Sequence, residues 1–261
     1  MPIKAKKSLG QHFLKNDEVS KRIVDSFTQN LPYPHTILEI GGGKGALTQF
    51  LIQKSIANLY IVEIDHQLAI YLSNTYPSLV HNIVQDNFLN LDLSTRFPGT
   101  IGVIGNFPYN LSSQILFKLL EYRDQVQEIV CMLQKEVAER VVSNPGNKVY
   151  GIPSVLLQAF YDVEYLFTVE PTVFSPPPKV HSAVIRLRRN SMGKLPCNEK
   201  VFIDLVKLGF QQRRKKLKNA LQGCKDWINN FELPLLNHRA EELSVQHFIT
   251  LTQQVMAPNT P

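Results

Sequence analysis

The sequence predicts a doubly wound α/β domain followed by a small all-helical domain. Short apolar runs alternate with helical periods through the first 190 residues. These runs lack the strict alternation of half-exposed strands, which is typical of a mostly parallel sheet with helices on both faces. Beyond residue 190 the helical periods continue without further strand patterns. We therefore expect an α/β domain at residues 1–190 and a helical domain at residues 191–261.

The expected elements follow one another along the chain. A first helix at residues 17–27 has apolar residues at 19, 23 and 27 on one face, with Asn16 or Asp17 as its N-cap. Strands are expected at residues 36–40, 59–64, 83–85, 100–104, 128–133, 161–168 and 183–187. Helices are expected between them at residues 46–54, 66–74, 112–122 and 135–142. A linker at 190–198 precedes helices at 201–221 and 245–256.

The composition excludes several classes of protein. Hydrophobic residues make up 44% of the chain and charged residues 19%, which excludes a disordered or low-complexity chain. No apolar run approaches the roughly 20 residues of a membrane span, and no apolar stretch follows the basic N-terminus as in a secretory signal. The three cysteines are far apart, which argues against a disulfide framework and a zinc site, so we expect no metal. We expect a cytoplasmic protein with reduced thiols.

The positive charge is concentrated toward the C-terminus. The net charge is +6, and residues 1–190 carry 18 basic and 16 acidic side chains against 10 and 6 in residues 191–261. The densest basic cluster is Q-Q-R-R-K-K-L-K-N at 211–219, on a predicted helix. We expect its cations to contact nucleic-acid phosphates, although a charge run is often only a solvated helix face. The candidate RNA-binding residues are Arg213, Arg214, Lys215, Lys216 and Lys218.

A glycine-rich turn follows the first strand and indicates a nucleotide-binding site. The run E-I-G-G-G-K-G-A at 39–46 leads into a helix, and glycines there let a ligand approach the backbone at the helix N-terminus. Gly41, Gly43 and Ala46 fit a dinucleotide fingerprint, and Glu63 ends the second strand where a carboxylate can accept ribose hydroxyl protons. Alone, this pattern predicts an adenosine-containing cofactor only weakly, because a tight turn without ligand has the same pattern.

An acidic side chain follows the third predicted strand. Asp86 lies where an adenine ring would extend, and its carboxylate could accept a hydrogen bond from the exocyclic amine. An isolated aspartate at such a position is more often a helix cap or a solvated loop residue. Asp86 therefore supports the nucleotide site only together with the glycine turn and Glu63.

The fourth strand runs into a turn whose residues suit a planar amine. The sequence G-N-F-P-Y-N occupies 105–110. The Asn106 side-chain oxygen can accept one hydrogen bond from an exocyclic NH2, and the backbone carbonyl of Phe107 or Pro108 can accept the other. Tyr109 offers a ring on which a base can stack. Two acceptors on an adenine amine would aim its lone pair, which is positional and electrostatic catalysis.

Here the sequence resembles a known family. Five segments together resemble the ribosomal RNA adenine dimethyltransferases, and the resemblance covers nearly the whole chain. It is strongest to the bacterial branch of this family that modifies the small subunit. These segments are K-S-L-G-Q-H-F-L at 7–14, E-I-G-G-G-K-G at 39–45, G-N-F-P-Y-N at 105–110, M-L-Q-K-E-V at 132–137 and F-S-P-P-P-K-V-H-S-A-V at 174–184. The resemblance implies a Rossmann-like methyltransferase domain and S-adenosylmethionine as cofactor. It also implies dimethylation of two adjacent adenosines in the 3′-terminal hairpin loop of 16S rRNA.

The resemblance also implies roles for particular residues. Its cofactor contacts fall on His12, Leu14, Gly41, Glu63, Asp86 and Asn106, within a site that also includes Gly43. His12 stands where Asn is more usual, and Phe107 stands where Leu is more usual. Residues 9–14 would form a flap across the cofactor, and Phe174 would stack on the target base opposite Tyr109 once the base is extruded. The implied partner is the small ribosomal subunit, and we expect a monomer without membrane association.

Three other interpretations stay open at this point. The family's large-subunit branch, which confers antibiotic resistance, is the rival within the enzyme class, and residues 190–261 favour the small-subunit branch. A non-catalytic RNA-binding assembly or transcription factor of the same fold is the second, and the intact run at 106–109 argues against it. A nicotinamide-dependent dehydrogenase is the rival at the level of the fold alone.

Overall fold

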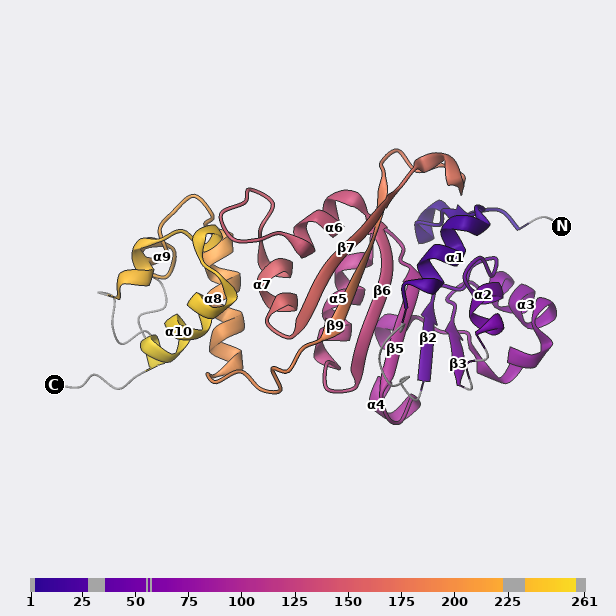
Figure 1. The fold of residues 1–261 in the computed structure, drawn as a ribbon, viewed down its shortest axis with the longest axis horizontal. Coiled ribbons are helices and arrows are strands. Elements are labelled where there is room, and N and C mark those ends of the chain that lie inside the picture. Colours follow the sequence, from indigo (N-terminus) through magenta and orange to yellow (C-terminus); the bar gives the residue numbers. More distant parts are fainter. Residues whose placement is uncertain (1–2, 28–35, 55, 57, 223–232, 257–261) are drawn as a thin grey trace. The chain divides into compact units, whose positions relative to one another are not determined.

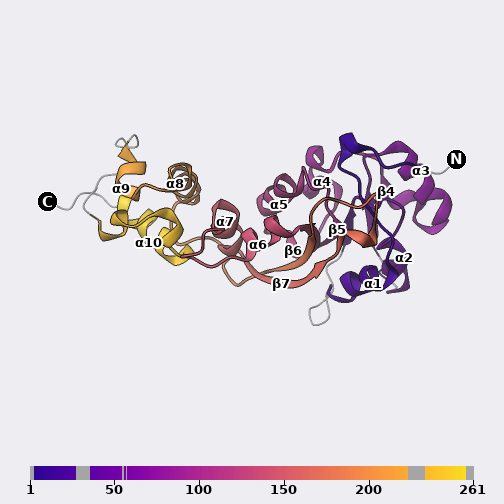
Figure 2. The same ribbon diagram turned by 90° about the horizontal axis from the view of Figure 1, so that it is seen from above.

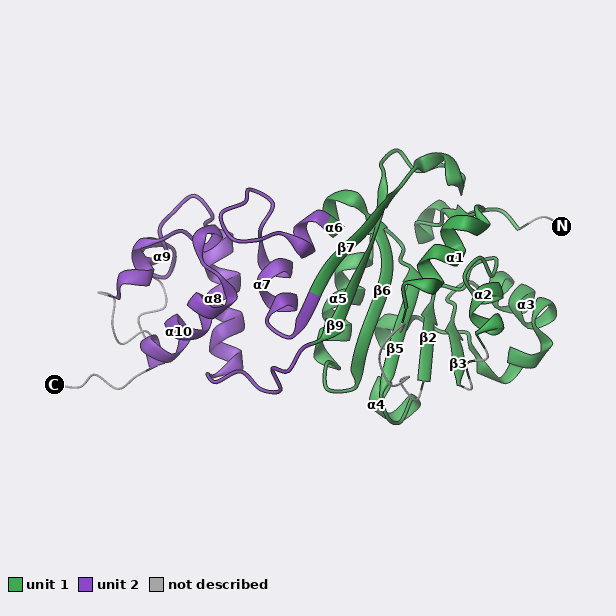
Figure 3. Ribbon diagram, in the orientation of Figure 1, with its two compact units in different colours: residues 1–138, 163–189 green, residues 139–162, 190–261 purple. Residues whose placement is uncertain are grey.

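The chain forms two compact units. The computed structural model describes residues 3–27, 36–54, 56, 58–222 and 233–256. Unit 1 comprises residues 1–138 and 163–189, and unit 2 comprises residues 139–162 and 190–261 (Figure 3). The predicted boundary at residue 190 therefore misses one segment, 139–162, because α7 (Ile152–Gln158) in that segment packs on α8 (Glu199–Gln211) and α10 (Val245–Met256). The roles assigned to the two domains stay predictions.

Unit 1 is built on a mostly parallel seven-stranded sheet, as the sequence predicts (Figure 1). Its strand order is β4-β3-β2-β5-β6-β9-β7. Neighbouring strands from β4 to β6 are parallel, and β9 runs antiparallel to β6. All seven expected strands form: β2 (Thr36–Ile40), β3 (Leu59–Val62), β4 (Ile83–Val84), β5 (Ile101–Asn106), β6 (Val126–Gln134), β7 (Tyr161–Val169) and β9 (Ser182–Arg189).

Helices cover both faces of this sheet, which confirms the predicted layering. Figure 2 shows α1 and α2 on one face and α4 and α5 on the other. Asn16 caps α1, and its Oδ1 accepts a hydrogen bond from the Val19 N–H at 2.9 Å. The stretch after β4 is a single short turn, η3 (Phe88–Asn90), followed by α4. The helices are α1 (Asp17–Asp25), α2 (Thr48–Gln53), α3 (His66–Thr75), α4 (Leu93–Arg96), α5 (Ser112–Glu121) and α6 (Lys135–Val142).

The core of unit 1 joins the sheet to the segment that precedes it. Every residue of β2 is buried, as expected of a central parallel strand. A short strand that the sequence did not indicate, β1 (Phe13–Leu14), pairs antiparallel with β8 (Phe174–Ser175). Leu14 and Phe174 lie opposite each other in this pair, and both belong to the buried apolar cluster with Ile104 and Val184. The segment that precedes α1 is therefore anchored in the core of unit 1 through β1.

The described part of unit 2 consists mainly of helices, which confirms the expected helical region. Its elements after the linker are α8, α9 (Leu217–Ala220), η6 (Pro234–Asn237), η7 (Ala240–Glu242) and α10. The single helix expected at 201–221 is wrong, because α8 ends at Gln211 and α9 begins at Leu217. Lys216 is extended, and the Leu217 N–H donates to the His238 carbonyl at 2.8 Å in place of a helical partner.

Gly105 packs tightly against the neighbouring central strand, β2. A Cβ atom at Gly105 would lie 2.5 Å from the Ile40 carbonyl oxygen and 3.0 Å from the Phe107 ring. Because the first of these atoms belongs to the backbone of β2, a side chain there would push β2 and β5 apart.

Gly105→Ala should therefore destabilise the protein by about 1–3 kcal/mol, the usual cost of overpacking a core. Gly193→Ala is the matched control, since a Cβ there meets nothing within 4 Å among the described residues. Urea unfolding followed by circular dichroism measures both variants. Equal stabilities of the two variants would show that the strands accommodate the methyl group.

Candidate functional site

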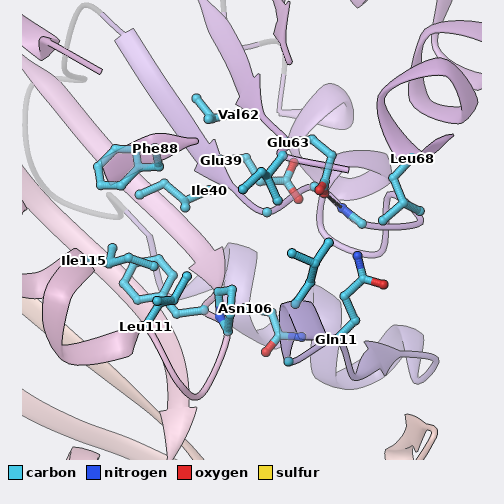
Figure 4. Close-up of a pocket in the computed structure, with 18 of the residues that line it drawn as sticks. Gln11, Glu39, Ile40, Val62, Glu63, Leu68, Phe88, Asn106, Leu111 and Ile115 are labelled. Carbon is cyan, nitrogen blue, oxygen red and sulfur yellow. Dashed lines mark hydrogen bonds between the residues drawn. The ribbon is translucent and has the colours of Figure 1, made fainter. Parts of the chain in front are cut away.

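A hollow lies at the carboxyl ends of the parallel strands in unit 1. Its volume is about 1010 Å³, including space open to solvent. This is the edge of a doubly wound sheet at which ligands bind. The lining comes from five stretches of chain: residues 9–14, 39–44 with 46–47, 62–64, 86–89, and 106–109 with Leu111. Leu68 and Ile115 complete it. In Figure 4, Glu39 and Glu63 point into the hollow, and Asn106 and Gln11 lie across from them.

The glycine turn after β2 holds Glu63 in place through its backbone. Gly41 and Gly43 have φ values of +75° and +55°, a left-handed conformation that favours glycine. The Gly43 N–H donates to Glu63 Oε2 at 2.9 Å, and the Asp65 N–H donates to Glu63 Oε1 at 2.9 Å. The turn is longer than the sequence suggested, because α2 begins at Thr48. Each oxygen of Glu63 thus has a backbone donor that fixes the carboxylate at the end of β3.

A second carboxyl group, Glu39, lies beside Glu63 and was not predicted as a site residue. Glu39 is 1% exposed, and the Thr48 hydroxyl donates to its Oε2 at 2.7 Å. Burial raises the pKa of Glu39 to about 8, and burial also raises the pKa of Glu63. Glu39 is therefore mostly neutral at pH 7, which spares Glu63 a neighbouring negative charge. The sequence could have pointed to Glu39, because it is a glutamate within an otherwise apolar strand pattern.

Asp65 binds two side chains of the N-terminal segment and so holds this segment beside the hollow. Lys6 Nζ lies 2.7 Å from Asp65 Oδ1, and Gln11 Nε2 donates to Asp65 Oδ2 at 3.1 Å. Burial alone would raise the pKa of Asp65, but the hydrogen bonds from Lys6 and Gln11 outweigh it and lower the pKa. Residues 9–14 line the hollow, as the predicted flap requires. The sequence did not single out Asp65, although an acid two residues past Glu63 is visible in it.

The turn after β5 is held by hydrogen bonds at each of its residues. Asn106 Nδ2 donates to the His12 carbonyl at 3.0 Å, and the Phe107 N–H donates to the Met132 carbonyl at 3.0 Å. The Pro108 carbonyl accepts from the Leu111 N–H and the Ser112 hydroxyl, both at 3.0 Å. The Asn106 amide therefore uses its NH2 group on the flap, and its oxygen is the atom suited to accept a bond from a ligand.

Tyr109 and His12 form a stacked pair beside this turn. Their ring centroids are 5.3 Å apart with an interplanar angle of 25°. His12 Nδ1 lies 2.8 Å from the Pro176 carbonyl, which only accepts, so Nδ1 carries a proton. Tyr109 is half-buried, and burial raises the pKa of its phenol. A planar side chain thus already occupies one face of the Tyr109 ring.

The structure brings most of the predicted cofactor and catalytic residues together. Those that line the hollow are His12, Leu14, Gly41, Gly43, Glu63, Asp86, Asn106, Phe107, Pro108 and Tyr109. Phe174 does not line it: its ring is 1% exposed and is buried in the core of unit 1. Stacking of Phe174 on a base stays a prediction, and it would require the β1–β8 pair to move.

An apolar wall beside Asp86 was also not predicted. Phe88 is 5% exposed and Ile64 is 45% exposed, and both line the hollow. Leu111 and Ile115 add to this wall from the start of α5. Apolar residues just after strands look like core residues in a sequence, so only the structure distinguishes them. The exposure of Ile64 marks a surface suited to the face of a flat ring.

The five basic candidates lie in unit 2 and differ in their surroundings. Arg214, Lys215 and Lys216 are exposed in the turn between α8 and α9. Arg213 instead forms an ion pair with Glu241, and its Nη2 donates to the Asn147 carbonyl at 3.3 Å. Lys218 is partly buried in α9. Arg213 therefore holds the stretch in place, while the next three side chains face solvent.

The described residues contain no metal-ligand cluster and no membrane-spanning helix. His, Cys, Asp and Glu side chains there form no group of three or more that could hold a metal ion. In the same parts of the chain, no helix is both long enough and apolar enough to cross a bilayer.

Comparisons with known proteins agree with this geometry. The chain is 50% identical to the ribosomal RNA small subunit methyltransferase A of Cytophaga hutchinsonii over 97% of this chain and 98% of that protein. It is 48% identical to the protein of the same name from Porphyromonas gingivalis, over 97% of this chain and 98% of that protein.

Solved structures share the fold. A dimethyladenosine transferase from Plasmodium falciparum matches with a TM-score of 0.75 at 23% identity, over 92% of this chain and 96% of that one. A 23S rRNA methyltransferase matches with a TM-score of 0.68 at 22% identity, over 93% of this chain and all of that one. The family model described as ribosomal RNA adenine dimethylase matches residues 3–256. The chain therefore belongs to the ribosomal RNA adenine dimethylase family.

Proposed function

We propose that this protein is an S-adenosylmethionine-dependent enzyme that dimethylates N6 of two adjacent adenosines in the 3′-terminal hairpin loop of 16S rRNA. The observation that carries the proposal is the turn after β5, where Asn106 and the backbone at Phe107 face a hollow that also contains Glu63 and Asp86. The names of relatives about 50% identical over nearly their whole length support the small subunit as substrate over the large subunit. Methylation assays on isolated small and large subunits test that choice.

The hollow fits S-adenosylmethionine by the chemistry of its lining. Glu63, fixed by two backbone donors, can accept the ribose hydroxyls, and Asp86 can accept the adenine amine. Ile64 and Phe88 offer apolar surface to the faces of the adenine ring. The glycine turn leaves room for the remainder of the molecule beside Gly41. When bound, this cofactor supplies an electrophilic methyl group on its sulfonium.

The turn after β5 orients the nucleophile. Asn106 Oδ1 accepts one N–H of the target amine. The Phe107 carbonyl accepts the second, because the Pro108 carbonyl already accepts two hydrogen bonds. These two acceptors draw the N6 lone pair out of conjugation with the ring and aim it along the line of transfer. An amine held in this way by Asn106 and Phe107 would displace the sulfur as it takes up the methyl group that S-adenosylmethionine supplies, and the N–H proton would then pass to water.

The RNA is held by stacking and by charge. Tyr109 supplies the ring on which the extruded adenine stacks. Arg214, Lys215 and Lys216 contact phosphates of the rRNA from unit 2. A monomeric protein acting in the cytoplasm, where small subunits are assembled, is part of the same proposal.

Asn106→Ala should lower kcat for methyl transfer about 100- to 1,000-fold, the usual cost of losing one acceptor or donor aimed at a reacting centre. Asn110→Ala is the control, since Asn110 is exposed in the same turn and does not line the hollow. Methyl transfer to small subunits measures both variants. Activity of Asn106→Ala within threefold of wild type would contradict the assignment.

Glu63→Gln should weaken S-adenosylmethionine binding by about 1.5–3 kcal/mol, the range for hydrogen bonds to a charged group. Because burial raises the pKa of Glu63, its carboxylate takes up a proton at a higher pH than an ordinary glutamate does, and wild-type affinity should fall as the pH is lowered from neutral. The variant should show a flatter profile over the same range. Titration calorimetry measures both, with Glu18→Gln, an exposed glutamate of α1, as control.

Replacing Arg214, Lys215 and Lys216 together by Gln should weaken binding to small subunits and flatten its salt dependence. The slope should fall by up to about 0.7–0.9 log units per log salt for each lost phosphate contact. Lys194, Lys200 and Lys207, exposed elsewhere in unit 2, give a control variant with the same change in charge. Equal salt slopes for the two triple variants would show that the stretch is only a solvated surface.

A further inference from the structure

We propose that Ser182 is a positioning residue that fixes the ring of Tyr109 for the target base. The inference rests on the proposed function and adds a residue to the base-binding side of that site. The Tyr109 hydroxyl and Ser182 Oγ are 2.5 Å apart, at the short end of the range for O–H···O hydrogen bonds. Ser182 is fully buried, and it is 73 residues away from Tyr109 in the sequence.

The backbone of Tyr109 is already fixed where it leaves the sheet. The Phe107 N–H is bonded to Met132 in β6, and the Pro108 carbonyl caps the start of α5. The side chain still has two rotatable bonds, so these contacts leave the direction of the ring free. The hydroxyl oxygen lies on the long axis of the ring, so a hydrogen bond to it fixes the direction of that axis.

Ser182 is well placed to provide this bond because it belongs to the rigid part of the sheet. It is the first residue of β9 and lies opposite Gln134 in the antiparallel pair with β6. The neighbouring His181 carbonyl accepts from the Lys135 N–H at 2.9 Å. Ala183, Val184 and Ile185, which follow Ser182, are fully buried. A hydroxyl among apolar core residues would cost free energy without a partner, and Tyr109 supplies one.

The face of the Tyr109 ring accepts a flat partner in this orientation. The His12 imidazole stacks on it at a centroid distance of 5.3 Å, held from its other side by the Pro176 carbonyl. A base that stacks on this face takes the place of His12. The hydrogen bond to Ser182 therefore orients the Tyr109 ring before the base arrives, and the face that His12 covers is the surface on which the base stacks.

This arrangement predicts an effect on turnover and not on the cofactor. Loss of the Ser182 hydroxyl lets the far end of the Tyr109 ring swing about the Cα–Cβ bond and displaces the adenine amine from the Asn106 acceptor. A misplacement of about 1 Å can cost about 100-fold in rate, so we expect kcat to fall about 10- to 100-fold in Ser182→Ala. S-adenosylmethionine affinity should stay at the wild-type value, and Ser182→Thr should restore most of the activity.

A double-mutant cycle tests whether Ser182 acts through the Tyr109 hydroxyl. Tyr109→Phe keeps the ring and removes the hydroxyl, so it should lower kcat to a similar extent, and the double variant should be no worse than either single one. Ser20→Ala controls for the loss of a buried serine, because Ser20 in α1 donates to the Asn16 carbonyl away from the hollow. It should leave kcat unchanged.

The readouts are kcat on small subunits, cofactor affinity by calorimetry and quenching of 2-aminopurine placed at the target position of the rRNA loop. Quenching by stacking should decrease in Ser182→Ala. Wild-type kcat in Ser182→Ala, or additive losses in the double variant, would overturn the inference. So would a loss of cofactor affinity or stability that accounts for the whole effect. A wild-type protein that methylates no rRNA would instead overturn the proposed function itself.

Discussion

The site depends on the register of three parallel strands. Glu39 of β2 lies beside Ile61 of β3 and Ile104 of β5, so these strands end at the same level. Every functional loop of unit 1 then begins at this level: the glycine turn after β2, Glu63 after β3 and Asn106 at the end of β5. A slip of one residue in any pair would turn an acceptor into the core. The close packing at Gly105 helps to fix this register.

Three carboxyl groups meet at this edge, and each is held in a different way. Glu39 is neutralised by burial, Glu63 is held by backbone donors, and Asp65 is paired with the Lys6 cation. Buried like charges would repel one another, but Glu39 is neutral and Asp65 is paired with a cation. Of these three groups, Glu63 is therefore the carboxylate available to a ligand. The pairing of Asp65 has a second consequence, since it holds the N-terminal segment over the hollow.

The sequence was sufficient for the parts of the fold that depend on local pattern. The seven strands, the helices between them and the places of Gly41, Gly43, Glu63, Asp86 and Asn106 on the hollow follow from apolar runs and from their ends. The β1–β8 pair could not be predicted, because each strand is only two residues long and its partner lies about 160 positions away. The break in the helix expected at 201–221 depends on the His238 carbonyl, a tertiary partner. The burial of Phe174 and the contact of Ser182 with Tyr109 arise in the same way, from packing between distant segments.

The two kinds of polar contact in this molecule respond differently to solvent. Glu39 and Glu63 are shielded from water, so salt screens the interaction of Glu63 with a ligand little. Arg214, Lys215 and Lys216 are exposed in the turn between α8 and α9, where added salt would compete with the phosphates that the proposed function places there. The ion pair of Arg213 with Glu241 holds this stretch without using the cations that face solvent. On the proposed function, added salt would weaken RNA binding in unit 2 and would leave the hollow around Glu63 nearly unchanged.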